Sequence, residues 1–234
     1  MQTLIIGDIH GCWDELAALL DQASIGADDR IIAVGDIVDR GPASPQVLEF
    51  FRKNPQAVSV MGNHERKHIR SFNGELRPAV SQAITRSQIG EADYPAAIEY
   101  MQTMSRSINL PEALLVHGFY EPGIPVEDQR DVVLIGTLTG EFHLKKNYDQ
   151  SWYELYDGPK PLIVGHHDYL STGAPMIYRD RVFAIDTGCC TGGRLTGLLL
   201  PAFKIISVPA ARNYWAEVRE AYRPDTPREK RENP

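Results

Sequence analysis

Glycines flanked by acidic, amide or imidazole side chains recur along this chain. The clusters are Gly7-Asp8-Ile9-His10-Gly11, Gly35-Asp36, Gly62-Asn63-His64-Glu65, His117-Gly118 and Gly165-His166. A lone Asp-x-His at a strand end caps a turn about as often as it binds a metal, but a whole set of such clusters favours one shared site. Because the donors are oxygen and imidazole without thiolate, they suit Mn²⁺, Fe or Zn²⁺ in a hydrolytic centre.

Short apolar runs precede the first three clusters and predict the strands that position them. Residues 3–6, 30–34 and 57–61 are strand-like, and each run leads into a glycine followed by a polar residue. Helical segments alternate with these runs, which is typical of βαβ units. The carboxyl ends of strands in an open α/β sheet face a common crevice, so we expect the clusters to converge there.

Two stretches of helical spacing accompany the early strands. In residues 12–23, Leu16 and Leu19 lie on one face, which predicts a helix packed against the sheet. Residues from about 77 to 106 are again helical in pattern, with a break near Gly90. We expect this second stretch to form a helical insertion over the site.

The second half of the chain is predicted to be mostly β. Strand-like runs dominate after Pro111, and residues 213–222 are expected to form a final helix. We expect a single domain over residues 1–222. Residues 223–234 are rich in proline and charge, which predicts a disordered tail.

Composition narrows the class of protein. The 234 residues are 43% hydrophobic, enough for the core of one large α/β domain. A formal net charge of -7 argues against extended nucleic acid as a partner, and no apolar run approaches the roughly 20 residues of a membrane span. Cys12, Cys189 and Cys190 are too few for a disulfide framework, so we expect a cytoplasmic protein.

The motifs support a family resemblance. Gly7 to Gly11, Gly35-Asp36-Ile37-Val38-Asp39-Arg40-Gly41 and Gly62 to Glu65 resemble the three defining motifs of the phosphoprotein phosphatase branch of calcineurin-like metallophosphoesterases. His117-Gly118 and Gly165-His166 fit the two later histidine motifs of that branch, and the ordered match runs from residue 7 to about residue 200. The resemblance implies a four-layer α/β/β/α sandwich.

The resemblance also implies a centre of two divalent metal ions. It assigns Asp8, His10 and Asp36 to the first metal, and Asp36, Asn63, His117 and His166 to the second, with Asp36 as the bridge. Manganese is expected first, with iron and zinc as alternatives. Two metals roughly 3.5 to 4 Å apart provide a bridging hydroxide for in-line attack on phosphorus. No Cys or Ser stands among the motifs as a nucleophile, so we expect no covalent intermediate.

Residues beside the expected ligands are predicted to assist the reaction. His64 follows a metal-bound Asn without being counted as a ligand, so its imidazole is free to protonate the leaving oxygen. Asp39 is expected to orient His64 and to favour its charged form. Arg40 offers a planar fork for phosphate oxygens.

The phosphate-binding arginines differ from those of eukaryotic members. Met61 occupies the position where those members carry an arginine before the Gly-Asn-His motif. Arg130 is the one arginine between the two later histidines, and Lys146 follows Thr139-Gly140-Glu141 as a basic residue does in some bacterial members. We therefore take Arg130 and Lys146 as candidate substrate-binding residues.

The substrate class is divided between two groups of relatives. Residues 185–196 resemble both bacterial Ser/Thr protein phosphatases and symmetrical diadenosine tetraphosphatases, whereas Asp39 favours the former. Phosphoserine or phosphothreonine in protein is the leading prediction. The alternatives are a symmetrical bis(5'-nucleosyl)-tetraphosphatase, a nucleotide or nucleic-acid-end phosphatase, and a non-catalytic phosphate binder on the same fold. The oligomeric state is left open.

Some histidines and aromatic residues lie outside this assignment. His68 would share a helix face with His64, but we expect a surface position for it. His167 is expected to turn away from the metals, where it could line the substrate rim. A few aromatic side chains could stack on a nucleotide base, although core packing is the first expectation for them. They are Trp13, Trp152, Tyr153 and Tyr156.

Overall fold

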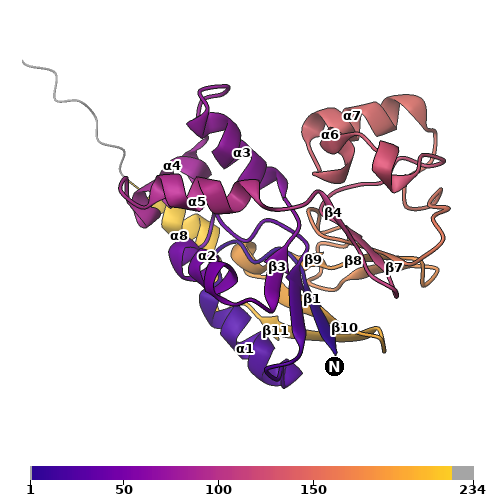
Figure 1. The fold of residues 1–234 in the computed structure, drawn as a ribbon, viewed down its shortest axis with the longest axis horizontal. Helices are drawn as coiled ribbons and strands as arrows, with labels where there is room; N and C mark the ends of the chain where they lie inside the picture. The colour runs from indigo at the N-terminus through magenta and orange to yellow at the C-terminus, as the bar shows by residue number, and fades with distance from the viewer. Residues whose placement is uncertain (1, 223–234) are drawn as a thin grey trace, which may run out of the picture.

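Two β-sheets pack face to face in the computed structural model, which describes residues 2–222 (Figure 1). The first is a 6-stranded sheet in the order β11-β10-β1-β2-β3, with β9 paired to β10. Its strands are β1 Thr3–Ile6, β2 Arg30–Ala33, β3 Ala57–Ser59, β9 Asp186–Thr187, β10 Arg194–Leu200 and β11 Lys204–Pro209. The chain runs parallel through β1, β2 and β3, as expected for βαβ units.

The second sheet has 5 strands in the order β4-β5-β6-β8-β7. Its strands are β4 Ser107–Asn109, β5 Leu114–Val116, β6 Leu162–Val164, β7 Met176–Tyr178 and β8 Val182–Ala184. The three central strands β5, β6 and β8 are parallel. Both sheets therefore collect the carboxyl ends of several strands along one edge.

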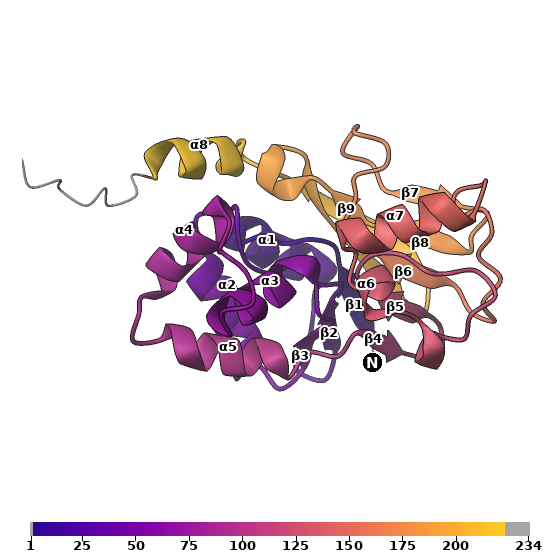
Figure 2. The same ribbon diagram turned by 90° about the horizontal axis from the view of Figure 1, so that it is seen from above.

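Helices cover the outer face of each sheet (Figures 1 and 2). They are α1 Trp13–Ala23, α2 Ser44–Lys53, α3 Asn63–Phe72, α4 Val80–Ile89, α5 Tyr94–Gln102, α6 Asp131–Leu134, α7 Leu138–Asn147 and α8 Tyr214–Ala221, with short 3₁₀ turns at Val126–Asp128 and Cys189–Thr191. Helices α1, α2 and α5 share a core with the first sheet, and α6 and α7 share one with the second. This confirms the α/β/β/α sandwich.

The central strands of each sheet, such as β1 and β6, are apolar on both faces because each face is buried. In β1, Leu4 and Ile6 pack toward the helices, whereas Ile5 packs between the sheets. In β6, Leu162 and Val164 pack toward the helices and Ile163 between the sheets. The sequence of a strand that is buried on both faces is a continuous apolar run. Such runs allowed these strands to be predicted from the sequence.

Helices α4 and α5 occupy the stretch 77–106 that was predicted to be helical. Gly90 separates them with a positive φ of 87°, a conformation that glycine adopts without a steric penalty. Helices α6 and α7 were not predicted, because α7 has no apolar stripe: Leu138 and Phe142 on it are 73% and 70% exposed. No helix within residues 2–222 is both long and apolar enough to cross a membrane.

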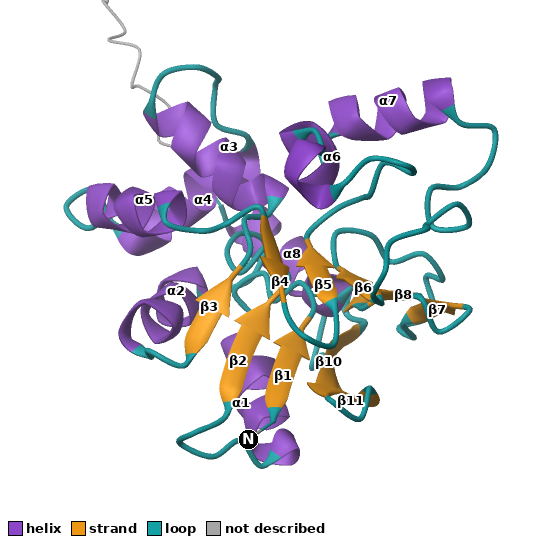
Figure 3. Cartoon of the chain, turned by 45° about the vertical axis from the view of Figure 1, so that its right-hand side comes forward, coloured by secondary structure: helices purple, strands orange, loops and turns teal. Residues whose placement is uncertain are grey.

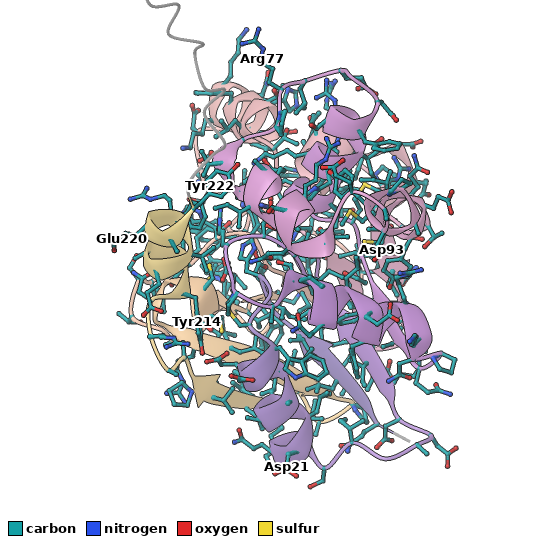
Figure 4. All side chains as sticks on the ribbon, turned by 90° about the vertical axis from the view of Figure 1, so that its left-hand side faces the viewer. Asp21, Arg77, Asp93, Tyr214, Glu220 and Tyr222 are labelled. Carbon is teal, nitrogen blue, oxygen red and sulfur yellow. The ribbon has the colours of Figure 1, made fainter. Side chains whose placement is uncertain are left out.

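The final helix α8 is attached to the first helix α1. The hydroxyl of Tyr214, at the start of α8, donates to the buried carboxylate of Glu15 in α1 at 2.7 Å. The backbone N–H of Ala211 donates to the same oxygen at 3.0 Å. Figure 4 shows Tyr214 at the end of α8 that faces α1. The predicted disordered tail at 223–234 lies outside the described residues.

Substitution of Ile163 tests the core between the sheets. Ile163 is fully buried there, whereas Ile177 on β7 is 41% exposed. We expect Ile163→Ala to lower the free energy of unfolding by about 2–5 kcal/mol through lost burial and a residual cavity. The control Ile177→Ala should cost under about 1 kcal/mol. Urea unfolding measures both, and equal losses would contradict the assigned packing.

Candidate metal centre

The predicted ligands stand where strands of both sheets end. Asp8, Asp36 and Asn63 follow β1, β2 and β3, while His117 and His166 follow β5 and β6. Figure 3 shows β1, β2 and β3 directed toward the same edge. The topology thus brings together side chains that are far apart in sequence, as the crevice argument predicts.

The backbone that carries these side chains adopts a left-handed conformation at several non-glycine residues. Positive φ angles occur at His10 (48°), Asp36 (50°), Asp39 (74°), Arg40 (64°) and His166 (71°). Each such residue costs of order 1–3 kcal/mol, so the surrounding fold must hold it in place. Five of the ten such residues in the part of the chain that the structure describes belong to this cluster, which is consistent with a functional site.

The carboxylate of Asp36 lies at the middle of the cluster. Its Oδ2 atom is 3.4 Å from His117 Nε2, 3.7 Å from His10 Nε2 and 3.9 Å from His64 Nε2. Two groups of possible metal-binding atoms share this carboxylate, and within each group the atoms lie within 4.8 Å of one another. One group is His10, Asp36 and His64, and the other is Asp36, His117 and His166.

The side chain of Asn63 faces the second group. Its Oδ1 atom is 3.1 Å from His117 Nε2 and 3.2 Å from His166 Nδ1. The other ring nitrogen of His117 donates to the carbonyl of Val34 at 2.7 Å, so in a neutral ring Nε2 carries a lone pair. With its amide oxygen turned toward both rings, Asn63 and the two neutral imidazoles would fit a cation between them, whereas the opposite amide orientation donates N–H groups to the same ring nitrogens.

His10 is oriented in the same way. Its Nδ1 donates to the carbonyl of Val38 at 2.9 Å, so its Nε2 lone pair faces the carboxylates of Asp36 and Asp8, the latter at 3.9 Å. Backbone carbonyls therefore fix the ring orientation at both histidines, which is how proteins commonly prepare imidazole ligands. The donor set fits divalent cations.

Buried acidic groups give the centre a negative field. Burial and the neighbouring carboxylate of Asp186 raise the pKa of Asp8 well above its usual range. Burial by itself lowers the pKa of His117, but Asp36 and Asp8 raise it, and the net value is about 10. Burial instead lowers the pKa of His166 to about 3, so that ring stays neutral with a lone pair free for a cation. Neutral imidazole beside buried carboxylates is a favourable electrostatic setting for a metal.

Glu65 has a positioning role that sequence reasoning missed. Its fully buried carboxylate accepts hydrogen bonds from the backbone N–H groups of Asp36 (2.9 Å), Ile37 (2.9 Å), Val38 (3.4 Å) and Gly62 (3.0 Å). Burial, with a contribution from Asp36, raises the pKa of Glu65 to about 7. The position of an acid in the third residue of a predicted helix was the available signal.

Asp39 joins two imidazoles. Its Oδ2 is 2.5 Å from His64 Nδ1, and its Oδ1 is 2.8 Å from His68 Nε2. His68 Nδ1 in turn lies 2.8 Å from the hydroxyl of Tyr94. The prediction of a surface position for His68 is therefore wrong: the side chain is fully buried, because α5 covers the face of α3 that carries it. The amide of Gln82, from α4, also donates to Asp39.

The predicted phosphate-binding residues are separated in space. Arg40 Nη1 lies 3.0 Å from His10 Nε2, at the edge of the metal ligands. Arg130 pairs instead with Glu121, at 3.3 Å, and Lys146 is exposed on α7. Among the residues that the structure describes, neither Arg130 nor Lys146 contacts a predicted ligand. Their proposed part in substrate binding has no support from this geometry.

Substitution of Glu65 tests its positioning role. We expect Glu65→Ala to lower the free energy of unfolding by about 3 kcal/mol or more, because several buried N–H groups lose their acceptor. The matched control is Glu75→Ala, which removes an exposed partner of Arg70 and should cost under about 1 kcal/mol. Denaturant unfolding of the metal-stripped proteins gives both values. A small loss for Glu65→Ala would rule out this role.

Comparisons with known proteins identify the family of this chain. The family model described as calcineurin-like phosphoesterase matches residues 1–187. The chain is 31% identical to asymmetrical bis(5'-nucleosyl)-tetraphosphatase PrpE of Halalkalibacterium halodurans, over 90% of this chain and 94% of that protein. Identity to the protein of the same name from Bacillus velezensis is 29%, over 90% and 93%.

A solved structure of a proposed diadenosine tetraphosphatase has the same architecture. It superposes with a TM-score of 0.73 at 27% identity, and the match covers 89% of this chain and 93% of that one. The motifs, the fold and the comparisons agree on the resemblance predicted from the sequence. The chain therefore belongs to the calcineurin-like phosphoesterase family and is a metal-dependent phosphoester hydrolase.

Proposed function

We propose that this enzyme hydrolyses bis(5'-nucleosyl) tetraphosphates asymmetrically. One water and one substrate molecule then yield a nucleoside monophosphate and a nucleoside triphosphate. The support is similarity to proteins named for this reaction along about nine-tenths of both chains. Those names specify asymmetrical cleavage. We therefore propose asymmetrical cleavage in place of the symmetrical cleavage that the sequence analysis gave as an alternative.

The observation that carries the proposal is the shared position of Asp36 between two groups of donors. In the first group we assign His64 to proton transfer and add Asp8, whose Oδ2 lies 3.9 Å from His10 Nε2, so Asp8, His10 and Asp36 would hold one cation. Asp36, Asn63, His117 and His166 would hold the other. Divalent cations held there would lower the pKa of a bound water and polarise the phosphate oxygens. Mn²⁺ is the first candidate for these cations. The ligand loops hold these side chains before substrate arrives, so little reorganisation is needed.

Residues of this chain bind and protonate the substrate. The guanidinium of Arg40 lies 3.0 Å from the ligand nitrogen of His10, so a cation on that nitrogen would free its planar fork to bind an anionic phosphate. The Nε2 atom of His64 is buried without a hydrogen-bond partner, so it is available to donate a proton to the leaving oxygen. Asp39 accepts from the other nitrogen of that ring and so fixes its orientation.

A second candidate function is the hydrolysis of phosphomonoesters, including phosphoserine and phosphothreonine in protein. The His64–Asp39 pair favours it, because an alkoxide leaving group needs a proton more than a polyphosphate leaving group does. The comparisons do not support a protein substrate, so this candidate ranks below the first.

Product analysis distinguishes these reactions. After metal stripping and addition of Mn²⁺, we expect diadenosine tetraphosphate to give AMP and ATP in equal amounts, separated by ion-exchange chromatography. Two ADP would contradict asymmetrical cleavage. Turnover of phosphopeptides without action on the dinucleotide would establish the second candidate instead.

Two aspartate variants make the product assay specific to the site. We expect Asp36→Asn to lower turnover by about 100-fold or more, because it weakens the shared ligand. Asp21→Asn, on the exposed surface of α1, is the matched control and should keep full turnover (Figure 4). Equal activity of the two variants would place the reaction elsewhere.

A further inference from the structure

A cavity of about 430 Å³ lies beside the metal centre, on the side of His166. Five of its lining side chains are aromatic: Phe119, Tyr148, Trp152, Tyr153 and Tyr169. None of them is a predicted metal ligand or a part of the proton transfer described above. The aromatic lining of this cavity therefore has no role in the metal binding or the proton transfer proposed above.

Phe119 and His167 connect this cavity with the metal centre. The ring centroid of Phe119 is 5.2 Å from that of His166 and 6.2 Å from that of Trp152, so one side chain borders both spaces. His167, next in the chain to a predicted ligand, also lines the cavity and lies 4.9 Å from the ring of Tyr169. A ligand in the cavity can thus reach the metal ligands with an extended substituent.

The aromatic walls are held in fixed positions. Tyr153 packs against Trp152 at 5.8 Å and against Tyr169 at 5.5 Å, in edge-to-face geometry. The indole Nε1 of Trp152 donates to the hydroxyl of Tyr169 at 3.1 Å. Fixed rings offer flat surfaces for stacking at a low entropic cost. The walls suit a planar ligand.

Polar groups accompany these rings. Glu141 and Lys145, paired at 2.6 Å on α7, line the cavity together with the aromatic side chains. A carboxylate can accept from an exocyclic amino group, and an ammonium can donate to a ring nitrogen. The edge of a planar ligand can also hydrogen-bond to either group while the pair stays intact, because a carboxylate has a second oxygen and an ammonium has further N–H groups. A flat ligand with a polar edge satisfies both features.

We propose that this cavity binds the purine base of one nucleoside of the substrate, with the phosphate chain passing His167 toward the metal ligands. This inference rests on the proposed function, since it names where that substrate is recognised. The larger cavity of about 710 Å³ beside Gly188 and Arg194 has no aromatic side chain among its described lining residues, so it offers no stacking surface.

Two tyrosines on one segment provide a matched test. Tyr153 lines the cavity, whereas Tyr156 packs against Tyr120 at 5.1 Å and does not line it. For each variant, kcat/KM for diadenosine tetraphosphate is divided by kcat/KM for glycerol phosphate, which has no base. Tyr153→Leu should lower this ratio about tenfold or more through lost stacking. Tyr156→Leu should leave the ratio within about twofold of its original value.

A binding measurement keeps the inference separate from the proposed function. Calorimetric titration with AMP needs no turnover, and Ser151→Trp fills the cavity from an exposed position as a second variant. We expect the wild-type chain to bind AMP. Both Tyr153→Leu and Ser151→Trp should bind AMP about tenfold or more weakly than the wild-type chain does.

The outcomes separate the two claims. Cleavage of the dinucleotide with an unchanged ratio and unchanged AMP binding in both variants would overturn the base-binding cavity and leave the proposed function intact. AMP binding that depends on the cavity, without cleavage of the dinucleotide, would overturn the proposed function and support the cavity. A preference for phosphopeptides that is lost in Tyr153→Leu would overturn the assignment to a base.

Discussion

The hydrogen bonds of the buried Glu65 carboxylate are the interaction on which the proposed metal centre depends. The carboxylate binds backbone N–H groups from the loop after β2 and from the loop after β3, so it fixes the distance between Asp36 and Asn63. The loops approach so closely that a side chain at Gly62 would overlap the Asp36 carboxylate. Burying a carboxylate is costly, and these N–H donors offset part of that cost, since the pKa of Glu65 is still raised to about 7.

The sandwich supplies the rigidity that this centre requires. Ligands with positive φ and closely placed buried carboxylates would relax in a flexible chain. Here most of them follow strands whose side chains are buried on both faces, namely β1, β2, β5 and β6, so these strand ends cannot shift independently. The same edge brings Phe119 and His166 into contact, which joins the metal centre to the aromatic cavity.

The sequence predicted those parts of the structure that local pattern determines. Apolar runs that end in Gly-Asp or Gly-Asn marked β1, β2 and β3 together with Asp8, Asp36 and Asn63. The burial of His68 could not be predicted, because it depends on α5 packing across α3 from a distant segment. Helix α7 was missed because its exposed face carries Leu138 and Phe142 and removes the amphipathic signal.

Electron paramagnetic resonance of the metal-stripped protein titrated with Mn²⁺ tests most directly whether two cations share Asp36. Two ions roughly 3.5 to 4 Å apart, joined by a carboxylate, are exchange-coupled, so the wild-type chain should bind two ions with a coupled spectrum. The variant Asp36→Asn should lose the coupling. A single bound ion, or two ions without coupling in the wild-type chain, would contradict the two-metal centre.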